Sequence, residues 1–134
     1  MDAFEDSGKL VLRVALGILI LLHGVAKLMG GIDPIVGMVV KAGLPAAVAY
    51  LVYVGEVVAP LLMIIGLFTR AAAAVVAINM VVAVGLAHAH QVFTMSKMGG
   101  WALELQGMYL FAALAVMLLG AGRLSAGGVS GRWN

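Results

Sequence analysis

The sequence predicts an all-α integral membrane protein, a left-handed antiparallel four-helix bundle, and three observations support this. The 134-residue chain is 64% hydrophobic and 10% charged, whereas soluble domains average about 45–50% apolar and about 25% charged residues. Its mean hydropathy is +1.15. Four apolar stretches approach the roughly 20 residues that cross a bilayer. We expect these spans at residues 9–29, 46–68, 71–90 and 101–119 of one domain that covers 1–134.

The first span follows a polar lead-in, residues 1–8, which we expect to lie on the surface. Because this lead-in lacks the basic segment of a signal peptide, we expect the first helix to be retained. Residues 32–45 contain Gly, Lys and Pro and are too short to span, so they predict a short interfacial or re-entrant helix. In the second span, Pro60 has no N–H to donate to the carbonyl of Glu56, which predicts a kink there.

The second half of the chain has one short and one longer connection. Thr69-Arg70 joins the second span to the third almost directly. A polar loop over residues 91–100 leads to the fourth span, which Gly120 ends. The Gly/Ser-rich tail to Asn134 is expected to be mobile.

The charged residues indicate topology rather than a nucleic-acid partner. The net charge is +2, and the eight Lys and Arg residues are scattered without a cluster, which argues against nucleic-acid binding. Five of them flank the side that holds both termini and three flank the other. Because Lys and Arg are enriched in cytoplasmic loops, we expect both termini in the cytoplasm.

The chain contains no cysteine. This excludes disulfides, thiolate nucleophiles, CxxC redox chemistry and Cys-ligated metal centres. A redox role must therefore rest on a bound cofactor, with quinone as the candidate, or on a partner oxidoreductase.

Ionisable residues gather in the outer half of the predicted bundle. His23 and Lys27 lie one helical turn apart on a single face. Glu56 lies about ten residues into its helix, near mid-membrane at about 1.5 Å per residue. An unpaired buried carboxylate is strongly unfavourable, so Glu56 is expected to be protonated or paired with Lys27 or a histidine.

These residues define a candidate polar site. Glu56 is the candidate proton-carrying carboxylate, and His23 and Lys27 are candidates for orienting a ligand. Further candidate ligand-binding residues are Glu104, His88, His90 and Tyr53. Tyr53, Met63 and Met108 could line a pocket for a flat apolar ring. No spacing singles out a metal or haem site.

Several of these side chains also have a purely structural interpretation. Lys27 could extend its ammonium group to the headgroups, and His88 and His90 could be interfacial residues. Asn79 is better explained as a helix-packing hydrogen bond than as a ligand. Arg13 and Arg70 are interpreted as inner-surface anchors.

The sequence resembles the DoxX family of small four-helix bacterial membrane proteins. The stretches that carry the resemblance are LRVALGILILLHGVAKLMGG at 12–31, AGLP at 42–45, GEVVAPLLMIIGLFTRAAA at 55–73, GGWALELQ at 99–106 and LLGAGRLS at 118–125. The resemblance implies four transmembrane helices and an association with redox processes, such as a subunit of a thiosulfate:quinone oxidoreductase. It implies no catalytic role for any single residue.

The leading hypothesis is a membrane subunit of a redox-linked system that binds quinone or a small sulfur or phenolic compound in a buried polar pocket. If the protein takes part in catalysis, we expect a component of a quinone-linked oxidoreductase rather than an independent catalyst. A non-catalytic anchor or assembly subunit and a small-solute transporter remain alternatives. The expected surroundings are the lipid bilayer, and a partner oxidoreductase and a homo-oligomer are both left open.

Overall fold

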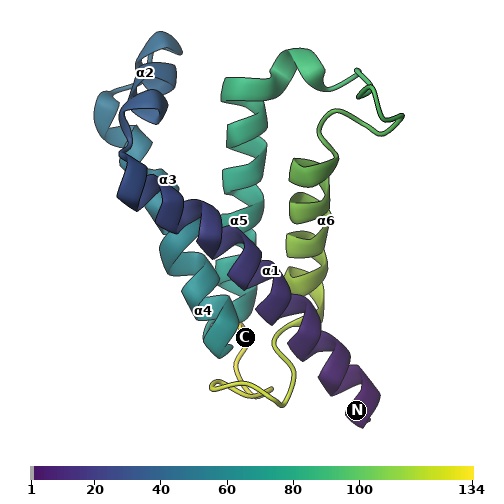
Figure 1. Ribbon diagram of the computed structural model, residues 1–134. Helices are drawn as coiled ribbons and strands as arrows, with labels where there is room; N and C mark the ends of the chain where they lie inside the picture. Colours follow the sequence, from purple (N-terminus) through teal and green to yellow (C-terminus); the bar gives the residue numbers. More distant parts are fainter. Residues whose placement is uncertain (1) are drawn as a thin grey trace.

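The computed structural model describes residues 2–134, and within them the fold is helical without a strand. Figure 1 shows a molecule that is narrow where both termini lie and wide at the opposite end, which carries α2. We call these the tail end and the α2 end. The helical elements in chain order are α1 (Ala3–Gly30), α2 (Asp33–Lys41), η1 (Ala46–Tyr50), α3 (Leu51–Tyr53), η2 (Val54–Val58), α4 (Ala59–Ile65), α5 (Thr69–Ala83), η3 (Val84–His88), η4 (Ala89–Gln91) and α6 (Glu104–Leu119).

Three continuous helical segments are long and apolar enough to cross a membrane, which confirms an α-helical membrane protein. They are Ala3–Gly30, Ala46–Ile65 and Thr69–Gln91, with hydropathy of 2.0, 2.2 and 2.0. Residues 2–8 are exposed apart from Asp6, as expected for a surface lead-in, but α1 begins at Ala3 rather than at residue 9. Asp2 caps it by accepting a hydrogen bond from the N–H of Glu5 at 2.8 Å.

The fourth predicted span contains α6, which begins at Glu104 rather than at residue 101. It has 16 residues and is about 24 Å long at 1.5 Å per residue, whereas a hydrocarbon core is about 30 Å thick. Helix α1 packs against α4 and α6, and α5 packs against the same two helices. Small buried residues such as Ala73 and Ala113, both 0% exposed, allow this close packing.

The short helix predicted between the first two spans is α2. The breaker pair Asp33-Pro34 also starts this helix, since proline fits the first helical turn, where no N–H partner is needed. Helix α2 and η1 pack together at the α2 end through a small apolar cluster that includes Ile32, Val39 and Ala49.

The tail, residues 120–134, is held against the tail end of the helices, so the expectation of a mobile tail is wrong. The N–H of Thr69 donates to Asn134 Oδ1 at 3.0 Å, and the N–H of Arg70 donates to the carbonyl of Trp133 at 2.8 Å. These tail groups satisfy N–H groups at the start of α5 that the helix itself leaves unpaired.

Arg13 lies inside this end of the molecule and is 1% exposed, rather than anchored at its surface. Its Nη1 donates to the carbonyls of Met63 and Ile64 at 2.8 and 2.7 Å. Its Nε donates to the carbonyl of Ala121 at 3.2 Å, and its Nη2 donates to that of Leu124. Arg13 therefore joins the end of α4 to the tail.

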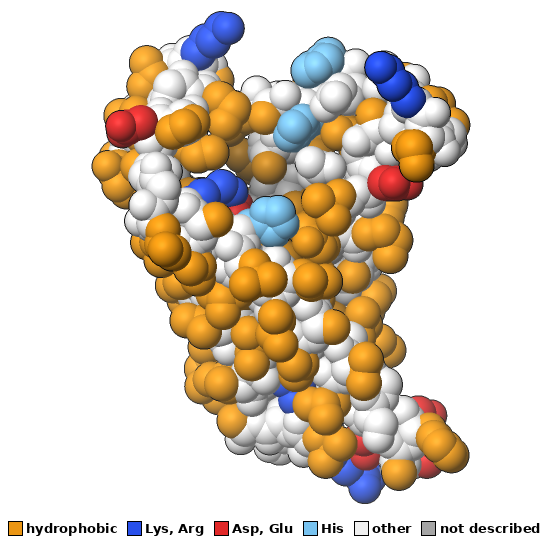
Figure 2. Space-filling view, viewed as in Figure 1, with side chains coloured by type: hydrophobic (Ala, Val, Ile, Leu, Met, Phe, Trp, Pro, Cys, Tyr) orange, Lys and Arg blue, Asp and Glu red, His pale blue; other side chains and the backbone are white. Residues whose placement is uncertain are grey.

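The middle of the molecule, between the tail end and the α2 end, is covered by apolar side chains (Figure 2). Large exposed hydrophobic residues include Leu22, Ile78, Val81 and Phe111, which are 45% or more exposed. A surface of this kind is stable in contact with lipid. The charged side chains visible in Figure 2 gather toward the two ends and around a hollow at the α2 end.

Candidate functional site

Glu56 lies in a distorted turn of the second long helix. Residues Val54–Val58 form a π-helical turn, in which the N–H of Ala59 donates to the carbonyl of Val54. Pro60 follows directly and has no N–H to offer the Glu56 carbonyl. The predicted irregularity at Glu56 and Pro60 thus takes the form of a π turn, a distortion that is frequent at functional sites.

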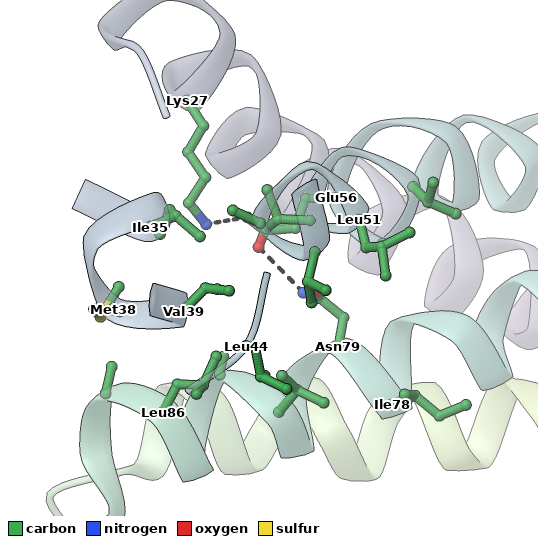
Figure 3. A pocket seen from close by; sticks show the side chains of 18 of the residues that line it. Lys27, Ile35, Met38, Val39, Leu44, Leu51, Glu56, Ile78, Asn79 and Leu86 are labelled. Carbon is green, nitrogen blue, oxygen red and sulfur yellow. Dashed lines mark hydrogen bonds and ion pairs between the residues drawn. The ribbon is translucent and has the colours of Figure 1, made fainter. Parts of the chain in front are cut away.

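Glu56 is buried, at 3% exposed, and both of its carboxylate oxygens have partners. Lys27 Nζ lies 2.5 Å from Oε1, and Asn79 Nδ2 donates to Oε2 at 3.1 Å. Figure 3 shows the Lys27 and Asn79 side chains converging on this carboxylate from α1 and α5. The structure therefore pairs Glu56 with Lys27, one of the partners expected from the sequence, and makes Asn79 an interhelical hydrogen-bond donor.

Two glycines allow the three helices to meet at this point. A Cβ atom at Gly24 of α1 would overlap the carbonyl oxygen of Glu56, so only glycine fits there. A Cβ atom at Gly55 would lie 2.7 Å from the Asn79 Cβ. Because both positions lack a side chain, α1 and α5 approach the π turn closely enough for Lys27 and Asn79 to reach Glu56.

An apolar cavity of about 580 Å³ lies on one side of Glu56. We use this name for the space lined by α2, η1, α3, η2, α5 and η3 that Figure 3 shows from close by. Aliphatic residues make up most of its wall, and its polar lining residues are Lys27, Glu56, Asn79 and His88. Ligand pockets in proteins have a similar size, about 300–1,000 Å³, and a similar pattern of few polar groups in an apolar wall.

A second, polar cavity of about 210 Å³ lies on the other side of Glu56, between α1, α5, η3 and α6. Six of its ten lining residues are polar: His23, Lys27, Glu56, His88, Gln106 and Tyr109. Lys27, Glu56, Ala83 and His88 line both cavities. The ion pair therefore forms part of the wall between them.

The two histidines in the polar cavity have different partners. His23 Nε2 lies 3.4 Å from the Tyr109 hydroxyl, and the two rings pack edge to face with centroids 5.8 Å apart. His88 Nδ1 lies 2.8 Å from Gln91 Oε1. His88 belongs to a second π-helical turn, η3, which continues α5. Glu56 and His88 are therefore two cavity residues that both lie in π turns.

The other candidate residues lie away from both cavities. The Tyr53 hydroxyl donates to the carbonyl of Lys27 at 3.3 Å, so Tyr53 touches the backbone that carries the ion pair rather than either cavity. Glu104 and His90 are exposed at the α2 end. Met63 is 0% exposed in the helix core and Met108 is 67% exposed on the outside, so the expected ring pocket of Tyr53, Met63 and Met108 is wrong.

Sequence reasoning did not single out Tyr109, and it named Gln106 only as a polar residue at the outer end of the fourth span, not as a ligand-binding residue. Tyr109 follows Gln106 by three residues and therefore lies on the same helical face. Two polar residues at this three-residue spacing in an otherwise apolar helix are the sequence signal that could have identified Tyr109. Which of the residues at the two cavities bind a ligand stays a prediction.

Within residues 2–134, no group of three or more His, Asp or Glu side chains is arranged to hold a metal ion. The site consists instead of one partly buried ion pair, an amide and two histidines at two cavities. This arrangement can bind a polar group at the edge of an apolar space and can hold or pass a proton.

Comparison with known proteins gives one match. A model of the DoxX family matches residues 8–89, which contain most of α1, all of α2 to η3 and the residues that pair at Glu56. The stretches at 99–106 and 118–125 lie beyond the matched range. No curated protein and no solved structure matches the chain. Because the match covers more than half of the chain, the protein belongs to the DoxX family.

Proposed function

We propose that this protein is a ligand-binding membrane subunit of a redox-linked system, and that its ligand is a quinone or a similar phenolic ring compound. The observation that carries the proposal is an apolar cavity of about 580 Å³ with a buried charged cluster at one edge. A flat apolar ring with oxygens on its rim has the complementary pattern. Such a ligand could enter from the bilayer, because cavity-lining residues such as Leu51 and Ile78 are each 63% exposed on the apolar surface.

The residues present fit a quinone. The aliphatic wall suits the ring and its apolar substituents, while the Lys27 ammonium and the Asn79 amide are donors that suit a carbonyl or phenolate oxygen. When bound, a quinone supplies two-electron, two-proton carrier chemistry. Because the chain has no cysteine, we propose that the electrons come from a partner oxidoreductase.

The chain's own residues have distinct tasks in this proposal. Lys27 and Asn79 hold the Glu56 carboxylate in place and orient the polar end of the ligand. Glu56 accepts or returns a proton at a carboxylate oxygen. The aliphatic wall excludes water and thereby strengthens these polar interactions. His88 lines both cavities and adds a further polar group to the site.

We further propose that α6 is a fourth membrane crossing, so that α1, the second long helix, α5 and α6 form an antiparallel bundle in a single domain. The closed series of contacts among α1, α4, α5 and α6 supports this arrangement. The excess of Lys and Arg near the termini supports a cytoplasmic location for both ends in a bacterial inner membrane.

The ligand proposal is tested by titrating a short-chain quinone into the protein purified in mild detergent. Lys27→Met is expected to weaken binding about tenfold or more, because it removes the charged donor to a quinone carbonyl, and a charge-assisted hydrogen bond contributes roughly 1.5–3 kcal/mol. Leu86→Trp, which fills the apolar cavity, is expected to abolish binding. Asp33→Asn removes an exposed carboxylate of α2 and should leave the affinity unchanged.

A folded wild-type protein that binds no quinone, or variants that bind it as well as wild type, would contradict the proposal. Either result would favour a non-catalytic anchor for an oxidoreductase.

A further inference from the structure

We propose that the two cavities form a dry and a wet chamber, and that the polar cavity is the water-filled route by which Glu56 exchanges protons with solvent at the α2 end. The proton route rests on the proposed function, since it needs a ligand hydroxyl in the apolar cavity. The difference in hydration between the two cavities does not rest on the proposed function, because it follows from the residues that line each cavity.

The composition of the walls predicts which cavity holds water. A buried site retains water when it is roomy and offers each water two to four polar partners, whereas an apolar cavity stays dry. The polar cavity has a volume of about 210 Å³ and six polar residues among its ten. A single water needs only ~10–15 Å³ of such space. In the apolar cavity, only four of the twenty lining residues are polar.

The openings of the cavities also differ. The exposed part of the apolar cavity is aliphatic, as at Leu51, Val54 and Ile78, and belongs to the lipid-facing surface. The polar cavity is bordered by the exposed side chain of His23, and Figure 2 shows His and Lys or Arg side chains around the hollow at the α2 end.

The ion pair lies where the two chambers meet. The Lys27 side chain is 29% exposed and that of Glu56 is 4% exposed, so Lys27, which lines both cavities, is the more accessible member of the pair. A proton that leaves a hydroxyl in the apolar cavity would bind a Glu56 oxygen and then pass to water in the polar cavity. The net change is one proton moved from ligand to solvent, with the carboxylate restored. The groups that face this route are Lys27 and His23 from α1, Asn79 from α5, His88 from η3 and Tyr109 from α6.

The absence of cysteine makes this inference directly measurable. Single cysteines are introduced and treated, in proteoliposomes, with small membrane-impermeant thiosulfonates of either charge. Met80 lines the polar cavity and is 7% exposed, whereas its neighbour Val81 is 57% exposed on the apolar surface. Met80→Cys is expected to react faster than Val81→Cys by about tenfold or more, since only the thiolate reacts and it forms in water.

A second pair on α6 guards against a Met80 variant that does not fold. Gln106 lines the polar cavity, and Met108 is 67% exposed on the outside two residues later. Gln106→Cys should react and Met108→Cys should not. Val52→Cys, in the apolar cavity, should resist the impermeant reagents in the folded protein and react only after denaturation.

Equal reactivity within both pairs, or a Val52 cysteine that reacts as fast as the Met80 and Gln106 cysteines, would overturn the two-chamber inference. Because no ligand is needed for labelling, such a failure would leave the quinone titration standing. Conversely, if the cysteines are labelled as expected but the protein binds no quinone, the proposal of a water-filled polar cavity stands and the proposal of a quinone ligand is rejected.

Discussion

Two buried charged side chains, Arg13 and Glu56, are stabilised in different ways. Arg13 is 1% exposed and donates to four backbone carbonyls. Glu56 is 3% exposed and is neutralised by Lys27, with Asn79 as a second donor. The planar guanidinium fork of arginine suits several carbonyls at once, which a lysine cannot match. The first residue therefore serves structure, and the second leaves a charged pair beside two cavities.

The role of Arg13 predicts a specific loss of stability. Arg13→Leu leaves buried carbonyls at the end of α4 and in the tail without donors, and removing a partner from such a buried network costs about 3–5 kcal/mol. Arg13→Lys should fall between Arg13→Leu and wild type. The measurement is the free energy of unfolding in detergent. Arg123→Leu is the control, because Arg123 is 60% exposed and 3.9 Å from Asp6, and exposed pairs contribute about 0–1 kcal/mol. Equal effects of Arg13→Leu and Arg123→Leu would contradict this assignment.

At the scale of the elements, the site depends on how closely α1 approaches the π turn. Proline frees the Glu56 carbonyl, and glycine on the neighbouring helix allows that carbonyl to approach the α1 backbone. The sequence contains both signals, Gly24 and Pro60, but they are 36 positions apart. Sequence reasoning recognised the proline and its effect on its own helix. It could not pair the proline with Gly24, because helical periodicity does not determine which faces of two helices meet.

Gly24→Ala is therefore expected to displace η2 from α1 and to separate Lys27 from Glu56. The added methyl group would overlap the Glu56 carbonyl, and overpacking of this kind typically costs about 1–3 kcal/mol. The matched control is Gly8→Ala in the same helix, where a Cβ meets nothing within 4 Å. That change should be neutral or should stabilise the protein by about 0.5–1 kcal/mol, because alanine favours helix. Thermal stability of both variants in detergent gives the test, and a Gly24 variant as stable as the Gly8 variant would disprove the close approach.

At the scale of the whole molecule, the two ends have different tasks. The tail end is closed by Arg13 and by residues 120–134, which supply partners to the start of α5. The α2 end is wide and carries both cavities. The polar groups that the sequence predicted in the outer half are at this end. The sequence predicted that all candidate residues lie close together, but Glu104 and His90 are exposed and line neither cavity.

The proposed four-crossing topology predicts that the loop before α6 and the tail lie on opposite sides of the membrane. Alkaline phosphatase inserted at Lys97 should be active, since it would reach the periplasm. The same enzyme fused after Asn134 should be inactive, while a green fluorescent protein fused there should fluoresce. If α6 does not cross, the two positions will report the same side, and the four-helix topology will be rejected.

The sequence by itself determined the class of the protein and predicted that its buried carboxylate has a partner. Composition and hydropathy identify membrane helices because lipid requires long apolar segments whose backbone groups are paired internally. The cost of burying a carboxylate predicted a partner for Glu56, and one predicted partner, Lys27, is present. The resemblance through residues 12–31 and 55–73 falls within the range of the family match.

Only the tertiary structure decided which helix faces meet. It paired Gly24 with the Glu56 carbonyl and brought Asn79 and Tyr109 to the site. It also placed Arg13 and the tail around one end. The physical reason is that lipid gives no preference among the apolar faces of a helix. Close packing and interhelical hydrogen bonds, which depend on all the helices together, determine the arrangement.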